Sequence, residues 1–314
     1  PWRRLLFGGC TIVTLGMVAG IGFSTDLVEI FERRLYRAPI IYTDQTLYQR
    51  VVITRNDDDV RLFLDGNLQF STRDEYRYHE MLVHPAMNAA RSRERVLVLG
   101  GGDGLVAREL LKYGDVGEII VVDLDPEVTR LAREFPLIRE ANGGALDDPR
   151  VRVINADAYT YVEENTDLFS VIIADLPDPN NEGLSKLYSQ TFYRMIRERL
   201  TPDGLFVTQA TSPYFVRESY WMIVNTLESA DLYTVPMQTY VPTFGNWGFV
   251  VAGRLRPPDL AVPAAIDLRY LTPTVLQNAQ TFDPDTERID TAINTLDRPV
   301  LPRVYEAGWA RWQN

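Results

Sequence analysis

An apolar run that breaks into glycines is the feature that most constrains this chain. Val96–Leu99 is followed by Gly100-Gly101-Gly102-Asp103-Gly104, and residues 105–113 then show a helical pattern. Glycine tolerates a positive φ and carries no Cβ, so such a turn lets the backbone approach a ligand closely at the start of a helix. The run therefore predicts a strand–turn–helix unit that binds a nucleotide-like molecule.

Asp103 helps to decide which kind of ligand this turn binds. A carboxylate among the glycines repels a phosphate, which favours a ligand with positive charge, such as a sulfonium or ammonium compound. The competing pattern is a dinucleotide fingerprint, because residues 102–107 read G-D-G-L-V-A and Asp123 closes the next predicted strand at the distance of a ribose-binding acid. A tight turn without any ligand is a third alternative.

The composition argues against several classes of protein. The chain has 314 residues, of which 46% are hydrophobic, enough for one substantial core and a smaller accessory domain. Its net charge of −11 argues against nucleic-acid binding, which needs a basic face. A single cysteine, Cys10, excludes an internal disulfide, and two histidines without a cysteine cluster lead us to expect no metal site.

The start of the chain has the pattern of a membrane segment. Residues 5–23 carry no charge and are just long enough to cross a bilayer, so residues 1–36 are predicted to be a transmembrane and amphipathic segment. A cleaved signal peptide and a buried helix are the alternatives. The first residue is Pro1, which suggests a fragment of a longer membrane protein.

The remaining sequence divides into three parts. Residues 37–75 alternate short β-rich runs with turns and predict a small β-domain. Residues 76–254 alternate strands with helices, which predicts a doubly wound, methyltransferase-like (Rossmann-like) α/β domain with a seven-stranded sheet. Its last loop, 241–246, is too short for a helical crossover, so the final strand should be antiparallel. Residues 255–314 form a predicted helical extension, with one helix expected at 285–296.

Acidic residues follow the predicted strands. The five are Asp103, Asp123, Asp157, Asp175 and Asp178. The carboxyl ends of strands in an open α/β sheet face one crevice, so we expect these acids to converge on the ligand. Asp157 has the simpler alternative of capping the next helix. Prolines keep the loop of Asp175 and Asp178 stiff, and this pair suits a diamine, since one acid can take the proton of the attacking amine while the other binds positive charge. A solvated acidic loop is the alternative.

As an ordered set, several motifs resemble the spermidine synthase family of polyamine aminopropyltransferases. The motifs are Asp65-Gly66 with Gln69, Asp74-Glu75 with Tyr78-His79-Glu80, residues 100–104, Asp175-x-x-Asp178-Pro179, and Leu187-Tyr188 with Phe192-Tyr193. The resemblance runs from about Tyr48 to Gly253. The apolar start, with Gly308-Trp309 and Trp312 near the end, resembles long bacterial forms that carry a membrane domain.

The resemblance implies transfer of an aminopropyl group from decarboxylated S-adenosylmethionine to a diamine such as putrescine, giving spermidine and methylthioadenosine without a further cofactor. It also implies a homodimer or larger homo-oligomer in the bacterial inner membrane, with the catalytic domain in the cytoplasm; a cytoplasmic protein is the alternative. A methyltransferase that uses intact S-adenosylmethionine, an NAD(P)-dependent oxidoreductase and a non-catalytic polyamine sensor remain open. The sequence does not name the acceptor amine.

Matching positions imply a role for each site residue. Asp175 would be the general base, assisted by Tyr78. The donor would be held by Gln49, Gly100, Gly102, Asp103, Asp123, Asp157 and Ala158. Within that set, Asp123 would hold the ribose hydroxyls, Asp157 would lie near the adenine amino group and Asp103 would bind the aminopropyl amine.

The acceptor amine would be bound by His79, Asp103, Asp178 and Gln209. Three places depart from the family's pattern. Asp123 stands where glutamate is common, Leu176 and Pro177 replace small hydroxyl residues, and Phe244 replaces a tyrosine expected near the acceptor.

Overall fold

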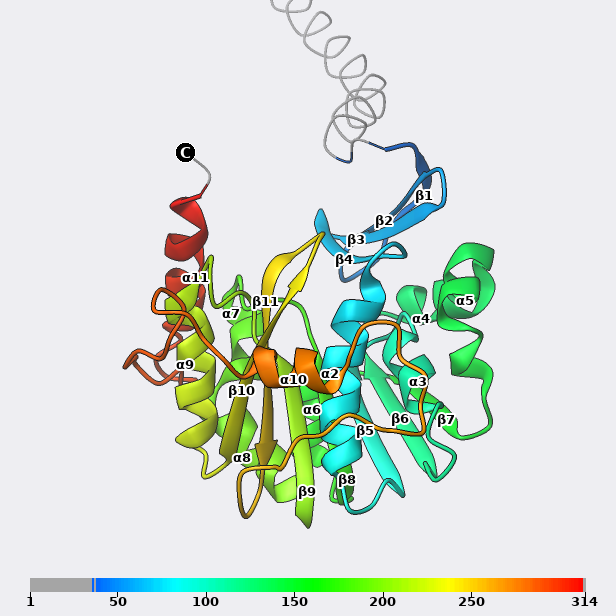
Figure 1. Ribbon diagram of the computed structural model, residues 1–314. Coiled ribbons are helices and arrows are strands. Elements are labelled where there is room, and N and C mark those ends of the chain that lie inside the picture. The colour runs from blue at the N-terminus through cyan, green and yellow to red at the C-terminus, as the bar shows by residue number, and fades with distance from the viewer. Residues whose placement is uncertain (1–35, 37, 313–314) are drawn as a thin grey trace, which may run out of the picture. The chain divides into compact units, whose positions relative to one another are not determined.

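The computed structural model of the protein describes residue 36 and residues 38–312. The chain divides into two compact units, residues 1–70 and residues 71–314. Figure 1 labels their helices and strands.

The first unit contains a four-stranded sheet in the order β1-β2-β3-β4. Its strands are β1 (Ile40–Gln45), β2 (Arg50–Asn56), β3 (Asp59–Leu64) and β4 (Asn67–Ser71). β2 pairs antiparallel with β3, and Asn56 opposite Asp59 closes the hairpin through a two-residue turn in which Asp57 has a φ of 55°. The small β-domain was predicted from the sequence, and the structure confirms it.

The second unit is built on a seven-stranded sheet in the order β10-β11-β9-β8-β5-β6-β7. Its strands are β5 (Arg95–Gly100), β6 (Glu118–Asp123), β7 (Val151–Asn155), β8 (Phe169–Asp175), β9 (Leu200–Gln209), β10 (Tyr233–Val241) and β11 (Gly245–Gly253). β5 to β9 are parallel, whereas β11 is antiparallel to both β9 and β10. The predicted doubly wound sheet and its antiparallel last strand are confirmed.

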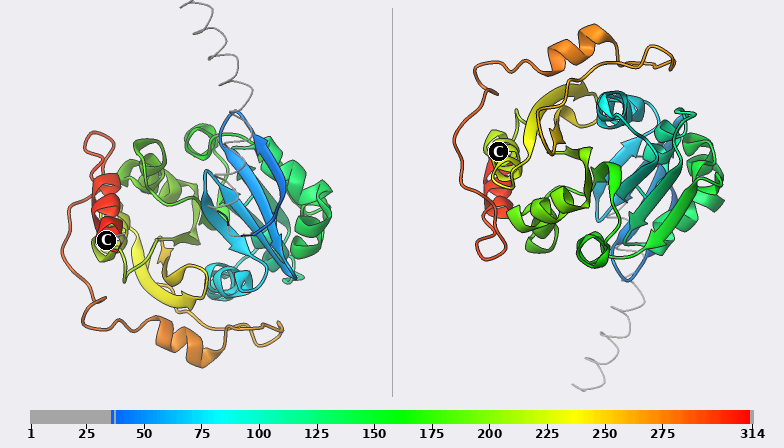
Figure 2. Two further views of the ribbon diagram at one scale, coloured as in Figure 1. Left: turned by 90° about the horizontal axis from the view of Figure 1, so that it is seen from above. Right: turned by 90° about the horizontal axis from the view of Figure 1, so that it is seen from below.

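Helices cover both faces of this sheet (Figure 2). One layer contains α2 (Glu75–Ala89), α3 (Leu105–Leu110), α4 (Pro126–Glu134) and α5 (Pro136–Asn142), followed by the short helix η1 (Ala145–Asp147). The other contains α6 (Ala158–Glu164), α8 (Gln190–Arg199) and α9 (Arg217–Glu228), with α7 (Glu182–Ser185) and η2 (Lys186–Tyr188) in the loop before α8. Because both faces are covered, the central strands are continuous apolar runs, such as the fully buried Val96–Leu99.

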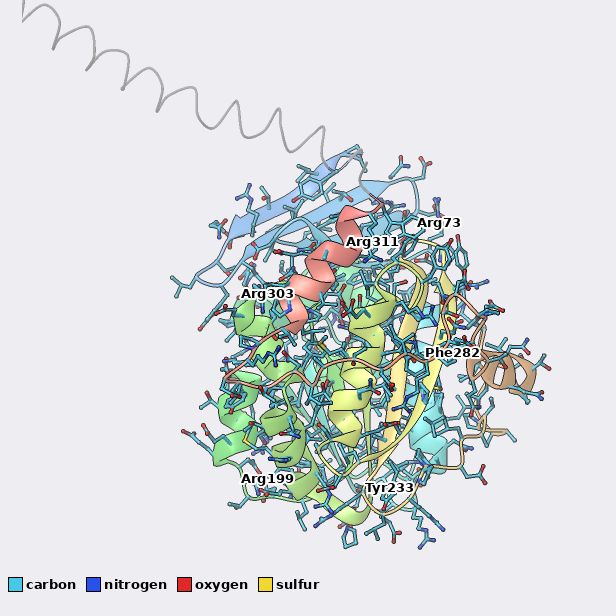
Figure 3. The ribbon with its side chains drawn as sticks, turned by 90° about the vertical axis from the view of Figure 1, so that its left-hand side faces the viewer. Arg73, Arg199, Tyr233, Phe282, Arg303 and Arg311 are labelled. Atoms are coloured by element: carbon cyan, nitrogen blue, oxygen red, sulfur yellow. The ribbon has the colours of Figure 1, made fainter. Side chains whose placement is uncertain are left out.

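The C-terminal segment differs from its prediction. No helix forms at residues 285–296; the helices of this segment are α10 (Pro273–Ala279) and α11 (Leu301–Ala310). Side chains of α9 bind the segment instead, since Trp221 Nε1 donates to the Thr286 carbonyl at 2.9 Å and Asn225 Nδ2 donates to Thr291 Oγ1 at 2.9 Å. Phe282, labelled in Figure 3, packs on Trp221 with ring centroids 5.0 Å apart. Contacts with α9, rather than the helical pattern of its own sequence, therefore determine the conformation of this segment.

The predicted location in a bacterial inner membrane needs correction. Within residue 36 and residues 38–312, no helix has both the length and the apolar character that crossing a bilayer requires. The predicted span at residues 5–23 lies outside the described residues.

Candidate active site

The carboxyl ends of the central parallel strands bring the predicted acids to one edge of the sheet. β5 and β8 end side by side, with Gly100 in register with Asp175. β6 ends beside β7, with Asp123 in register with Asn155. Neighbouring strands therefore place the glycine turn, Asp123 and Asp175 at the edge where open α/β sheets bind ligands.

The glycine turn packs directly against two of these acids. Gly100, with a φ of 79°, faces the Asp175 carbonyl so closely that a Cβ would collide with it. A Cβ on Gly102 would lie 2.5 Å from the Asp123 carboxylate, and the Gly102 N–H donates to Asp123 Oδ2 at 3.0 Å. Both positions therefore require glycine, because any side chain would displace an acid of the crevice.

Asp103 is held inside the turn, only 9% exposed. The Leu105 N–H donates to its Oδ1 at 2.9 Å, and Asn142 Nδ2 donates to its carbonyl at 2.8 Å. Burial raises the pKa of Asp103 to about 6, although the nearby His79 opposes this shift. Burial likewise raises the pKa of Asp123 to about 6, against the hydrogen bonds that it accepts from Asp125 and Gly102. A cationic ligand beside these groups would stabilise their ionised forms.

Asp175 is joined to α2 by a short hydrogen bond. The Tyr78 hydroxyl donates to Asp175 Oδ1 at 2.6 Å. Burial raises the pKa of Asp175, while His79 and the Tyr78 hydroxyl act in the opposite direction. Burial and the charge of Asp175 also raise the pKa of Tyr78 well above its usual value, so the phenol stays neutral and acts as a donor.

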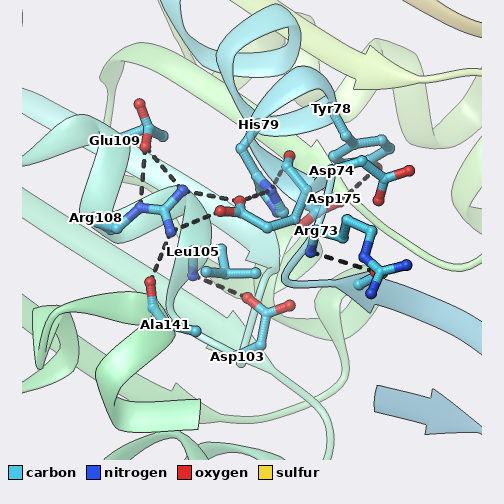
Figure 4. A network of polar contacts seen from close by, with 12 residues as sticks. Arg73, Asp74, Tyr78, His79, Asp103, Leu105, Arg108, Glu109, Ala141 and Asp175 are labelled. Atoms are coloured by element: carbon cyan, nitrogen blue, oxygen red, sulfur yellow. Dashed lines mark hydrogen bonds and ion pairs between the residues drawn. The ribbon is translucent and has the colours of Figure 1, made fainter. Parts of the chain in front are cut away.

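His79 carries a positive charge next to these acids. Its Nδ1 lies 2.9 Å from Glu75 Oε2, and Arg108 donates to the same carboxylate at 2.8 Å (Figure 4). Burial alone would lower the pKa of His79, but Glu75, assisted by Asp103 and Asp175, raises it to about 9. Arg108 and Glu75 come from different helices, and their ion pair fixes the imidazolium that faces the two acids.

Asp178 belongs to a second group of polar side chains. Its Oδ2 accepts from the Tyr305 hydroxyl at 2.7 Å and from Thr211 Oγ1 at 3.4 Å, and its Oδ1 accepts from Gln209 Nε2 at 3.3 Å. Burial raises the pKa of Asp178 to about 6, and these three donors limit the rise. Gln209 Nε2 also donates to the Tyr188 hydroxyl at 2.6 Å.

Asp157 and Ala158 lie at the start of α6. Asp157 is its N-cap, because its Oδ1 accepts from the Thr160 N–H at 3.0 Å. Its Oδ2 also forms an ion pair with Lys186 Nζ at 2.8 Å. Burial alone would raise the pKa of Asp157, but Lys186 and the cap hydrogen bond together lower it. The structure thus gives Asp157 the capping role that was its alternative, and its role toward adenine stays a prediction.

The structure places Gln49 in the turn between β1 and β2 of the first unit, where its N–H donates to Thr46 Oγ1 at 3.0 Å. Its role toward the nucleoside stays a prediction. Four residues of the site carried no sequence signal: Arg108, Lys186, Thr211 and Tyr305. Thr211 has a φ of 57°, and Tyr305 lies in the C-terminal segment, so neither has a local pattern that connects it with Asp178. In the part of the chain that the structure describes, no three His, Cys, Asp or Glu residues group as metal ligands.

The fold and the site define a Rossmann-like α/β protein whose crevice combines a glycine turn with several carboxylates. A family model described as the spermine/spermidine synthase domain matches residues 75–255. The chain therefore belongs to the spermine/spermidine synthase family.

Relatives in several bacteria support this assignment. The chain is 43% identical to a polyamine aminopropyltransferase of Oceanobacillus iheyensis over 96% of this chain and 60% of the relative. It is also 43% identical to one of Leptospira interrogans, again over 96% of this chain and 60% of the relative. The chain thus spans about 60% of the length of the curated relatives it matches.

Solved structures agree with this result. A spermidine synthase in complex with the transition state analogue AdoDATO has a TM-score of 0.69 and 27% identity, covering 78% of this chain and 85% of that one. The spermidine synthase of Thermotoga maritima gives the same TM-score of 0.69 and 27% identity, with 78% and 84% covered.

Proposed function

We propose that this protein is a polyamine aminopropyltransferase. It would transfer the aminopropyl group of decarboxylated S-adenosylmethionine to a diamine such as putrescine, giving spermidine and methylthioadenosine, with no further cofactor. Residues 76–254 would carry the reaction, and residues 255–314 would complete the site. The names of the relatives and the family model support this activity.

The observation that carries the proposal is the set of carboxylates around the glycine turn. Asp103, Asp175 and Asp178 have pKa values raised by burial, so their ionised forms need cationic partners. The donor brings a sulfonium and an ammonium group, and the diamine brings two amines. An intact S-adenosylmethionine would instead bring its carboxylate toward Asp103, which disfavours a methyltransferase.

The donor would bind along the glycine turn. Gly100 and Gly102 would let its nucleoside approach the backbone, Asp123 would accept hydrogen bonds from the ribose, and Gln49 would hold the nucleoside. Asp103 would pair with the aminopropyl ammonium. At the other end, Asp157 and the neighbouring Ala158 would bind the adenine side.

Adenine binding by Asp157 requires a change at Lys186. The ammonium of Lys186 holds Asp157 Oδ2 at 2.8 Å, where the adenine amino group would otherwise donate. Both side chains are about a third exposed, 35% each, so this ion pair is weak and can exchange for a ligand.

The reaction would be an in-line displacement. The amine nitrogen attacks the carbon next to the sulfonium, the C–S bond breaks, and its electron pair stays on sulfur as a neutral thioether. The proton leaves the nitrogen for Asp175, which Tyr78 holds through the 2.6 Å hydrogen bond. A raised pKa makes Asp175 a better proton acceptor than an ordinary carboxylate. Asp178, Gln209 and His79 would line the acceptor side.

Mass spectrometry of reaction products tests the activity. The chain is incubated with decarboxylated S-adenosylmethionine and a panel of diamines, and in parallel with intact S-adenosylmethionine. We expect methylthioadenosine and a product heavier by one aminopropyl group only with the decarboxylated donor, which should also bind more tightly in calorimetry. A methylated product from the intact donor would contradict the proposal.

The predicted homo-oligomer stays a proposal as well. Apolar side chains around the first hairpin of the first unit supply a surface for it, since Leu47 is 97% exposed, Tyr48 50% and Ile41 40%. Light scattering coupled to size-exclusion chromatography would measure the mass, and a monomer at micromolar concentration would reject it.

A further inference from the structure

The C-terminal helix α11 lies outside the family domain at residues 75–255 and still touches the candidate site. It runs beside α9, as Figures 1 and 3 show, with Arg303 and Arg311 labelled on it. We infer that Tyr305 of this helix is a positioning residue for the acceptor amine, because its hydroxyl holds the Asp178 carboxylate at 2.7 Å. This inference rests on the proposed function.

Several contacts fix α11 in the position that this hydrogen bond needs. Leu301 is fully buried, and its N–H donates to Asn294 Oδ1 at 3.3 Å. A Cβ on Gly308 would lie 2.6 Å from a methyl group of Val216, so glycine allows the helix to approach the start of α9. After α11, Trp312 Nε1 donates to the Phe215 carbonyl at 3.1 Å. The helix is therefore held at its beginning, its middle and its end.

The same segment also fixes the loop that follows Asp178. Asn294 is 1% exposed, and its Nδ2 donates to the Ser185 and Tyr188 carbonyls, each at 3.1 Å. Tyr188 in turn donates to the Pro177 carbonyl at 2.9 Å. One buried amide thus connects Leu301 at the start of α11 with Tyr188, which in turn binds the loop next to Asp178, so the same contacts hold Tyr305 and Asp178 together.

Asp178 accepts three side-chain hydrogen bonds of unequal length. Tyr305 makes the shortest contact, on Oδ2, whereas Gln209 and Thr211 contact the carboxylate at 3.3 and 3.4 Å. A carboxylate offers about four lone-pair positions and these donors use three, so Asp178 has the capacity to accept one more hydrogen bond, which an ammonium group could donate. Tyr305 therefore acts on the amine through Asp178: it orients the carboxylate and favours its ionised form.

This role predicts a particular dependence on pH. The titratable groups around Asp178 are Tyr305 of α11, Tyr78 of α2, Tyr188 of η2 and Asp175 of β8. Burial raises the pKa of all three tyrosines, so they stay neutral. Removing the Tyr305 hydroxyl should raise the pKa of Asp178 above its value of about 6 and leave less carboxylate near neutral pH.

Steady-state kinetics of Y305F would test the inference. We expect KM for the diamine to rise on the order of tenfold at pH 7, the range for losing a hydrogen bond to a charged group, with kcat and the donor KM changed much less. Relative to wild type, the defect should shrink as the pH rises to 9, because Asp178 is then ionised in both proteins. Y214F is the matched control, since it removes a hydroxyl from a tyrosine that packs on Trp312 and is 42% exposed.

A double-mutant comparison separates positioning from a merely structural role. In D178N, which has no carboxylate to ionise, adding Y305F should produce no pH-dependent change in the diamine KM. An unchanged diamine KM in Y305F, or a loss of the same size at every pH with a lowered Tm, would overturn the inference. If wild type turns over no diamine, the proposed function itself fails; if wild type is active and Y305F behaves like it, only this inference fails.

Discussion

Asp175 and Asp178 share one loop but have different partners, and substitution should separate their roles. Asp175→Asn keeps an oxygen that can accept the Tyr78 hydroxyl now bound at 2.6 Å, yet an amide cannot take the ammonium proton. We expect kcat to fall by roughly 10²- to 10⁴-fold, with donor affinity within a few fold. The loss should shrink as pH rises, since more of the amine is then neutral in solution.

Asp178→Asn is the matched comparison for that experiment. It removes a negative charge from the acceptor side, so the diamine KM should rise while kcat falls less than in Asp175→Asn. Product formation followed across pH 6 to 10 gives both constants. Near-normal turnover of Asp175→Asn at neutral pH would show that another group takes the proton.

One side chain at the N-terminus of helix α6, that of Asp157, has two candidate roles. Asp157 caps the helix through the Thr160 N–H at 3.0 Å, and it is proposed to bind adenine. Asp157→Ser keeps a capping oxygen but is too short to reach a ligand, so Tm should stay near that of wild type while donor affinity falls about tenfold. Asp157→Ala should lose donor affinity and also about 1 kcal/mol of stability. Calorimetry and thermal melts measure both, and unchanged donor affinity in Asp157→Ser would leave Asp157 as a cap alone.

The sequence predicts elements well where burial alone decides them. The strand residues 96–99 and 119–122 are buried, and such strands appear as plain apolar runs. The helix expected at 285–296 is wrong because its backbone is bound by side chains of α9, such as Trp221. A helical pattern in one segment holds no information about such partners.

In the molecule as a whole, too, the sequence predicts only part of the candidate site. Sheet topology brings Asp103, Asp123 and Asp175 to one edge, and that could be predicted because parallel strands end together. The contact of Tyr305 with Asp178 depends on how a distant helix packs, and it has no counterpart in local spacing. Site residues that strand order brings together can be predicted from the sequence, whereas site residues that helix packing brings together cannot.

Stability of the whole molecule at low pH depends on a buried ion-pair group. Burial would raise the pKa of Glu109, but His84, Lys112 and Arg108 lower it to about 2, well below the usual 4.5. A carboxyl with a lowered folded-state pKa contributes stability above its unfolded value and loses it as pH falls toward 2. The stability that Glu109 contributes should therefore be lost as pH falls from 4.5 toward 2.

The site groups give the opposite slope from about pH 3.8 upward. Asp103, Asp123 and Asp178 have pKa values of about 6 in the folded protein against 3.8 unfolded, and His79 has about 9 against 6.5. In each case the group keeps its proton to a higher pH in the folded state than in the unfolded state. The free energy of unfolding therefore falls as pH rises from 3.8 to 6, because of the acids, and from 6.5 to 9, because of His79. Three such acids outweigh the single Glu109 carboxyl, so we expect Tm of the unliganded protein to decline from about pH 4 toward pH 9. Asp178→Asn should raise the free energy of unfolding at pH 8 by on the order of 1–3 kcal/mol and leave it unchanged at pH 4, where the acid is neutral in the fold. Differential scanning calorimetry across this range measures both effects, and a Tm that rises steadily from pH 5 to 9 would contradict the assignment of these acids as ionisable groups held ready for a cation.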